Sequence, residues 1–210
     1  SGEKWSEVHH KNGVAEGLET SWHKSGEKLR KTFYKDGKEE GLSTSWFTNG
    51  KRASEIPYKN GYEEGLSTFW YESGRKKKET HYKNGYAEGL ETEWYESGRK
   101  KSQVLLKNWD WDGLVTFWHK SGKKKTEYHY KNGVAEGLET WWYESGKKKS
   151  KVLFKNGKED GIFKEWYPSG KKKSLKHYKN GKENGIRKEW NEDGALAFEG
   201  NFVDGVEEIK

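Results

Sequence analysis

The sequence predicts an all-β fold: an elongated, single-layer antiparallel β-meander, or solenoid, of about eight 24-residue β-hairpin repeats. Three observations predict it. Glycines of turn type return every 24 residues without insertion or deletion, each repeat holds two turn signals about 12 residues apart, and the segments between turns alternate in side-chain character. Because alternation with period 2 indicates a strand, we interpret each repeat as one hairpin of a continuous sheet.

The repeat is marked by three glycine series and one tryptophan series. In the first series, glycine follows Asn or Asp, which is the strongest short-range hairpin signal, and Trp109 stands once in its place. In the second, glycine precedes Leu or Ile, and in the third it ends a turn, usually Ser-Gly, four residues after a tryptophan. The tryptophans are Trp22, Trp46, Trp70, Trp94, Trp118, Trp142, Trp166 and Trp190.

The composition limits how the sheet can be stabilised. Hydrophobic residues make up 30% of the chain and charged residues 36%, which is too little apolar material for a thick core, whereas aromatic residues reach 15%. With two-residue loops at both turns, Tyr82 would pair with Gly65 on one side and Ala87 on the other. A large ring would then lie over a nearly bare residue, an arrangement that supports glycines in sheets.

The pattern "YKDGKEEGLSTSWFTNGKR" (34–52) resembles the MORN repeat variant found in bacterial antitoxin-like repeat proteins, and "FEGNFVDG" (198–205) is similar to a MORN opening. The resemblance covers essentially the whole chain. It implies β-hairpin repeats in an elongated sheet that serves as a scaffold or binding surface without catalytic activity.

The repeat also predicts the domain organisation. We expect residues 1–210 to form a single repeat domain, with a partial repeat or cap at 1–10 and core repeats at 11–194. Residues 195–210 are expected to be a capping repeat, because the lysines of other repeats give way to Ala195-Leu196-Ala197-Phe198.

Residues that carry chemistry show no catalytic or metal-binding grouping. The chain has no cysteine, and His81, His129 and His177 share a column but lie two repeats apart, roughly 19 Å by strand spacing. Paired acids such as Glu63-Glu64 recur as a charge ladder, and no Ser/His/Asp grouping stands apart from the repeat. We therefore expect no enzyme, no cofactor and no metal site.

A basic ladder is the first candidate surface. The net charge is +7, and basic clusters recur once per repeat. They predict either solubilising rows paired with acids, which also protect sheet edges, or a site for a polyanion such as nucleic acid or an anionic lipid surface. The ladder residues are Lys76, Lys78, Lys100, Lys124, Lys148 and Lys172.

Aromatic residues that vary between repeats form the second candidate surface. They predict a strip for docking a protein or stacking sugar rings, or they shield a thin sheet. The strip residues are Phe69, Tyr71, Tyr95, Phe117, Trp141 and Tyr143.

The loop Trp109-Asp110-Trp111 is the third candidate surface. A type I′ turn needs positive φ at the position of Trp109, at about 1–2 kcal/mol for a non-glycine residue. The loop is therefore expected to be remodelled or strained, with a double tryptophan at its tip as a binding site. The alternative is that tryptophan replaced the turn glycine without a function, by tolerated sequence drift or by design.

The leading hypothesis is a non-enzymatic scaffold that binds another protein through the sheet surface. The alternatives are recognition of a glycan or polyanion by the aromatic and lysine columns, and an engineered scaffold, since Met and Cys are both absent. No apolar run is long enough to span a membrane. The sequence fixes neither the partner, the oligomeric state nor the compartment, although it favours secretion or a bacterial cell surface.

Overall fold

A computed structural model describes residues 5–209, and every regular element in that range is a β-strand. Residues 1–4 of the expected N-terminal cap and residue 210 of the C-terminal cap lie outside the described residues. The chain divides into two compact units. The first unit comprises residues 1–100 and 106–109, and the second comprises 101–105 and 110–210.

The first unit contains the strands of the N-terminal repeats. They are β1 (Ser6–Glu7), β2 (His10–Lys11), β3 (Val14–Ala15), β4 (Gly17–Trp22), β5 (Lys28–Lys35), β6 (Lys38–Trp46), β7 (Arg52–Lys59), β8 (Tyr62–Glu63), β9 (Gly65–Trp70), β10 (Lys76–Lys83), β11 (Tyr86–Ala87) and β12 (Gly89–Trp94).

The second unit repeats the same alternation of long and short strands, and β13 (Lys100–Lys107) contributes residues to both units. Its remaining strands are β14 (Asp110–Trp111), β15 (Gly113–Trp118), β16 (Lys124–Lys131), β17 (Val134–Ala135), β18 (Gly137–Trp142), β19 (Lys148–Lys155), β20 (Lys158–Glu159), β21 (Gly161–Trp166), β22 (Lys172–Lys179), β23 (Lys182–Glu183), β24 (Gly185–Trp190), β25 (Leu196–Val203) and β26 (Val206–Glu207).

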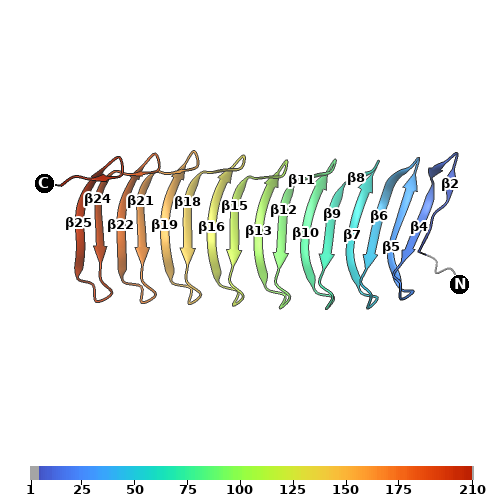
Figure 1. Cartoon of the computed structure of the whole chain (residues 1–210), viewed down its shortest axis with the longest axis horizontal. Helices are drawn as coiled ribbons and strands as arrows, with labels where there is room; N and C mark the ends of the chain where they lie inside the picture. Colours follow the sequence, from blue (N-terminus) through green and yellow to red (C-terminus); the bar gives the residue numbers. More distant parts are fainter. Residues whose placement is uncertain (1–4, 210) are drawn as a thin grey trace. The chain divides into compact units, whose positions relative to one another are not determined.

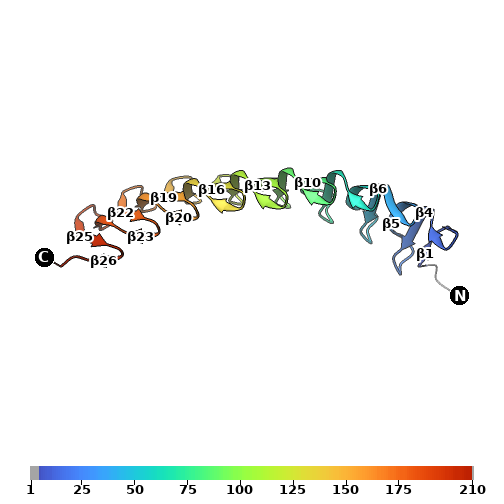
Figure 2. The same cartoon turned by 90° about the horizontal axis from the view of Figure 1, so that it is seen from above.

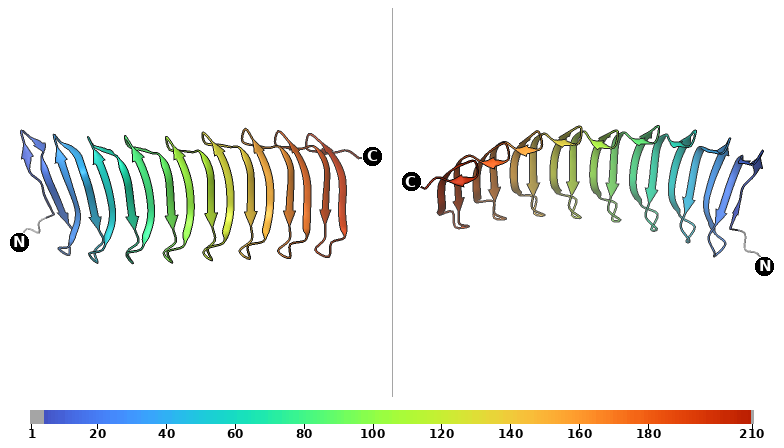
Figure 3. Two further views of the ribbon diagram at one scale, coloured as in Figure 1. Left: turned by 180° about the vertical axis from the view of Figure 1, so that it is seen from behind. Right: turned by 45° about the horizontal axis from the view of Figure 1, so that its top comes forward.

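Within each unit the long strands lie side by side in chain order, and their pairings are antiparallel (Figure 1). The views of Figures 2 and 3 show that no second layer covers either face of a unit's sheet over the described residues. The predicted fold class, an all-β antiparallel meander of 24-residue hairpin repeats, is confirmed.

The Asn-Gly turns have the predicted two-residue loop. Lys83 pairs with Tyr86 across the turn, and Asn84 and Gly85 have φ of 50° and 79°, as a type I′ turn requires. The N–H of Gly85 donates to the carbonyl of Glu63, one repeat earlier, at 2.9 Å. Each turn is therefore hydrogen-bonded to the hairpin before it.

The Ser-Gly turns correct the second loop prediction. The N–H of Tyr71 donates to the carbonyl of Arg75, and Gly74, with φ of 89°, donates to the carbonyl of Tyr71, both at 2.8 Å. The loop therefore has three residues, a type I turn followed by a left-handed glycine, and the predicted two-residue loop is wrong here.

A β-bulge at Lys77 removes the effect of this additional loop residue. Trp70 pairs with Lys76, but the next pair is Phe69 with Lys78, so Lys77 has no cross-strand partner. The predicted pairings of Tyr82 with Gly65 and with Ala87 are confirmed because the two deviations cancel.

The glycine that precedes Leu or Ile has a positive φ and begins each six-residue strand, such as β9 and β18. At Gly137, φ is 97°, and an added Cβ would lie 3.3 Å from the Cβ of His129. The side chain against the vacant side of this glycine is therefore that of His129, whereas the predicted contact was with the following residue, Tyr130. Only glycine suits both the conformation and the close approach.

Each unit's sheet has two faces. Because cross-strand partners share a face, the side of Tyr82, Thr80 and Lys78 in β10 also carries Ser67 and Phe69 of β9. We call this side the tyrosine face. The opposite side carries the repeated tryptophans, and we call it the tryptophan face.

Burial within this single layer falls mainly on small polar residues. Ser67 is 0% exposed and Thr80 1% exposed, and Val115 is one of few fully buried aliphatic residues among those described. Ladder hydrogen bonds and long side chains that cover the sheet therefore replace a thick core.

Candidate functional site

Five aromatic side chains meet on the tyrosine face of the second unit. They are Trp111, Phe117, Tyr128, Tyr130 and Trp141, and we call them the aromatic cluster. The ring centroids of Trp111 and Tyr130 lie 5.0 Å apart, and those of Tyr128 and Trp141 lie 5.9 Å apart. Phe117 connects the two pairs, at 6.2 Å from Trp111 and 6.2 Å from Tyr128.

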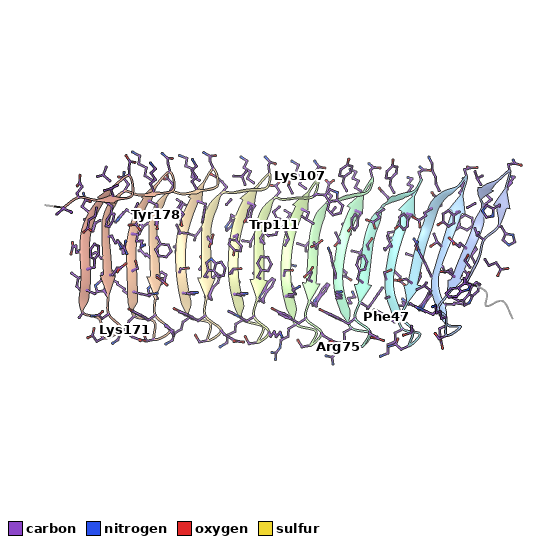
Figure 4. All side chains as sticks on the ribbon, viewed as in Figure 1. Phe47, Arg75, Lys107, Trp111, Lys171 and Tyr178 are labelled. Atoms are coloured by element: carbon purple, nitrogen blue, oxygen red, sulfur yellow. The ribbon has the colours of Figure 1, made fainter. Side chains whose placement is uncertain are left out.

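Strand register brings these residues together. Thr126 of β16 pairs with Phe117 of β15 on one side and with Trp141 of β18 on the other, so both rings lie on its face. Tyr128 and Tyr130 follow Thr126 at steps of two along β16 and share that face. Trp111, labelled in Figure 4, lies in β14 directly after an Asn-Gly-type turn.

A shallow pocket of about 200 Å³ opens within the cluster. Phe117, Tyr128 and Trp141 form its walls, and Thr126 and Lys125 complete its lining. Tyr128 stands at 83° to Phe117 and 88° to Trp141, so the rings meet edge to face. This arrangement makes a concave site and not a flat stacking platform.

Glu139 is the acid associated with the cluster. The indole N–H of Trp141 donates a hydrogen bond to its carboxylate, which holds the orientation of the indole. Burial raises the pKa of Glu139, and it also raises the pKa values of Tyr128 and Tyr130. Both tyrosines are therefore neutral hydroxyl donors at pH 7.

The structure brings together three of the nine predicted aromatic and loop residues, Trp111, Phe117 and Trp141. Sequence reasoning missed Tyr128 and Tyr130. The signal for Tyr128 is its column, which holds threonine or an aliphatic residue in neighbouring repeats, as in Thr80 and Val152. Tyr130 belongs to the recurring tyrosine column and was assigned to the scaffold.

Tyr71 and Tyr143 are built into the scaffold. The hydroxyl of Tyr71 donates to the carbonyl of Trp94, and that of Tyr143 to the carbonyl of Trp166, both at 2.7 Å. Each ring thus connects one hairpin to the next. Phe69 lies on the tyrosine face of the first unit opposite Lys78, and Tyr95 is half-buried next to a Ser-Gly turn.

The Trp109 turn is strained and is not remodelled. Trp109 keeps the two-residue geometry with φ of 72°, is 53% exposed, and contacts Tyr82 edge to face at 5.7 Å. Trp111 is not at the loop tip but in β14, where it packs on Tyr130. Between them, Asp110 lies against Gly133, where an added Cβ would be 3.2 Å from its Oδ1. The two tryptophans therefore have separate surroundings.

Several lysines of the basic ladder have partners. Lys76 pairs with Glu79, and Lys124 pairs with Glu127 while lying 5.7 Å from the ring centroid of Trp142. Lys78 binds Glu91 at 2.9 Å on the tyrosine face. Because of the bulge, Lys76 and Lys78 lie on opposite faces, which alternation alone did not predict.

The remaining ladder residues differ in their contacts. Lys172 lies 5.7 Å from the ring centroid of Trp190, and Lys148 is opposite Trp142. Lys100 also has an interaction partner.

The first basic residue of each cluster caps a turn. The Nζ atoms of Lys123, Lys147 and Lys171 donate to carbonyl oxygens of the following Ser-Gly-type turn at 2.6, 2.7 and 3.1 Å. Figure 4 shows Lys171 at this row of turns. These contacts use part of the positive charge to hold consecutive hairpins together.

The recurring acids have a structural role as well. The carboxylates of Glu40 and Glu64 accept the backbone N–H of Asn60 and Asn84, at 2.8 and 2.7 Å, in the turn of the next repeat. Within residues 5–209, no group of three His, Asp or Glu side chains is placed to hold a metal ion. The same residues contain no helix of the length and apolarity that a membrane span needs.

Comparison with known families matches seven consecutive segments of the array between residues 39 and 204. The profile of the MORN repeat variant matches residues 39–60, 63–84, 87–108, 111–132, 135–156, 159–180 and 183–204. Comparison with curated proteins gives no significant match. Each matched segment begins in the strand that follows an Asn-Gly-type turn and ends in the next such turn. The chain therefore belongs to the MORN repeat variant family.

Proposed function

We propose that this protein is a non-enzymatic scaffold that binds another protein through the aromatic cluster on the tyrosine face of its second unit. MORN repeats are typically binding or scaffold repeats without catalytic activity, which agrees with this function. The specific partner-binding surface is our inference from the cluster.

One observation carries the proposal. The five rings contact one another on a sheet face that no other described element covers, and all five are half-buried instead of fully buried. Aromatic side chains in uncovered apolar patches are favoured anchors of protein interfaces. A scaffold role alone does not require them, because the same positions in other repeats hold Thr80 and Glu93.

The geometry favours a protein over a glycan or a polyanion. Sugar rings stack on flat aromatic faces, whereas the rings of the cluster meet edge to face around a small pocket. Binding to a polyanion depends on free cations, whereas Lys123 and Lys147 cap turns and Lys124 pairs with Glu127.

The experiment compares interaction partners of two double variants. Phe117→Ala with Trp141→Ala removes two walls of the pocket, whereas Leu114→Ala with Leu138→Ala removes apolar side chains of the same strands from the tryptophan face. Each protein is immobilised and exposed to extracts of the source cells, and captured proteins are quantified by mass spectrometry. We expect the specific captured set to persist with the Leu variant and to disappear with the aromatic variant.

Both double variants are first checked for folding by circular dichroism and thermal unfolding. An unchanged captured set in the folded aromatic variant would contradict the proposal. A heparin column run in parallel tests the polyanion alternative, for which retention of the parent protein should fall steeply with salt.

A further inference from the structure

Two lysines flank Trp141 and have no acidic partner among the described residues. Lys125 occupies the bulge of β16, between the Phe117–Thr126 and Trp118–Lys124 pairs, and lines the pocket. Lys149 occupies the same bulge position in β19, next to the Trp141–Ser150 pair. Trp141 thus has a lysine of this type on each of its two neighbouring strands.

The equivalent bulge lysines elsewhere are engaged. In β22, Lys173 donates to Glu165 at 2.9 Å and lies 5.9 Å from the ring centroid of Tyr167. In the first unit, Lys77 lies 5.8 Å from the ring centroid of Tyr71. Both of these bulge lysines therefore contact a tyrosine ring, and Lys173 contacts an acid on the tyrosine face as well.

Around the pocket, aromatic residues replace the acid. Glu165 pairs with the residue that follows its bulge lysine, Lys173. The residue at the same position is Phe117 for Lys125 and Trp141 for Lys149. Glu139, the acid that contacts the cluster, accepts the indole N–H of Trp141. The aromatic residues of the pocket therefore stand where Glu165 contacts Lys173, and no acid contacts Lys125 or Lys149 among the described residues.

We propose that the pocket binds an acidic segment of a partner protein, with one aromatic side chain between the rings and carboxylates on Lys125 and Lys149. This inference rests on the proposed function and specifies the chemistry of the partner. Charge complementarity supports it, because hydrogen bonds between lysine and carboxylate are about twice as strong as neutral ones.

The dimensions agree with a single side chain flanked by acids. A volume of about 200 Å³ is below the ~300–1,000 Å³ typical of sites for whole small ligands. The two lysines are separated by two strand spacings, on the order of 10 Å. About three residues of extended chain span this distance, so acids close to either side of the aromatic residue can reach both.

The test is a selection of random peptides displayed on phage against the full chain. We expect the enriched peptides to carry Trp, Phe or Tyr with Asp or Glu within a few residues. Synthetic copies are then measured by fluorescence anisotropy. Lys125→Glu with Lys149→Glu should weaken binding about tenfold or more, since each substitution puts like charges together.

The matched control is Lys148→Glu. Lys148 precedes Lys149 in β19 but pairs with Trp142 on the tryptophan face. Binding to this variant should stay within about twofold of the parent, because it changes the net charge but not the pocket. Equal loss in Lys148→Glu and Lys149→Glu would show a general charge effect and overturn the inference.

The aromatic variant separates the two proposals. If Trp141→Ala abolishes peptide binding but the lysine variants do not, the aromatic site stands and the acidic partner is wrong. If basic or uncharged peptides are enriched, or no peptide is enriched, the acidic partner is wrong as well. If enriched peptides bind Trp141→Ala as tightly as the parent, the proposed function itself fails.

Discussion

The aromatic cluster of the second unit and the equivalent positions of the first unit differ in chemistry on one shared backbone. In the cluster, Tyr128 packs between Phe117 and Trp141. In the first unit, Thr80 takes the place of Tyr128, and its hydroxyl donates to Glu91 at 2.9 Å. One surface is aromatic and flanked by two lysines that have no acidic partner among the described residues, and the other is a network of polar contacts.

The polar network of the first unit pairs a lysine with an acid. Lys78 binds the same Glu91 carboxylate that Thr80 contacts, at 2.9 Å. Burial, followed by the charges of Glu63 and Glu91, raises the pKa of Tyr82 to about 12. Its hydroxyl therefore stays neutral across the physiological range, and Glu91 beside it has both Lys78 and Thr80 as partners within the sheet.

This difference shows that two sets of residues have separate roles in the repeat. We call the recurring residues that set the backbone the frame, and the variable residues on the tyrosine face the content. The turn glycines, the bulge and the capping acids set the positions of side chains in both units, whereas the residues at tyrosine-face positions vary freely. Function is therefore expected to depend on a few variable positions, and stability on the recurring ones.

The largest effect should come from the frame. Gly89→Val in the first unit and Gly137→Val in the second both place a β-branched residue at positive φ, 87° and 97°. We expect each to lower the free energy of unfolding by about 2–3 kcal/mol. Denaturant unfolding of the full chain measures both. A loss confined to one variant would show that the two units do not share the same frame.

An intermediate effect should distinguish the variable tyrosine-face residues of the two units. Tyr128→Ala removes ring contacts with Phe117, Tyr130 and Trp141, for a loss of about 2 kcal/mol. Thr80→Ala, at the same repeat position, removes one hydrogen bond, for about 1 kcal/mol. Chemical denaturation again measures both, and a larger loss for Thr80→Ala would mean that the polar network, not the cluster, is the more stabilising surface.

The sequence predicted the frame well because the frame is local. Asn-Gly fixes a type I′ turn by its own conformational preference, and alternation fixes which residues share a face. The pairing of Tyr82 with Ala87 followed from these rules alone, whereas the pairing with Gly65 assumed a two-residue Ser-Gly loop and holds because the bulge offsets the third loop residue. The longer Ser-Gly loop was missed because the bulge at Lys77 restores the register that a shorter loop would give.

The candidate site was predictable only in part. Phe117 and Trp141 share a column that holds Ser45, Glu93 or Glu165 in other repeats, and that variation identifies them in the sequence. Tyr143 also looked variable, but its hydroxyl donates to the carbonyl of Trp166, a contact that depends on the neighbouring hairpin. Whether Lys125 has an acidic partner depends on which residue lies across from its bulge. Predicting this contact requires the register of the bulge as well as the sequence.

The smallest expected effect tests the electrostatics of the cluster. Burial raises the pKa of Glu139 above its ordinary value of 4.5, so the folded protein binds this proton more tightly than the unfolded chain. The ionised carboxylate therefore disfavours the fold at neutral pH, and this penalty disappears as the pH falls below 4.5. Glu139→Gln removes the charge but keeps an oxygen that can accept the indole N–H of Trp141.

We expect Glu139→Gln to raise the melting temperature slightly at pH 7 and to leave it unchanged at pH 4, measured by circular dichroism. Glu144→Gln, at an exposed turn position, controls for the change in net charge. If both variants shift the melting temperature equally at pH 7, the effect is one of net charge. Burial in the aromatic cluster would then not destabilise the ionised carboxylate of Glu139, and the two surfaces would not differ in their effect on a buried charge.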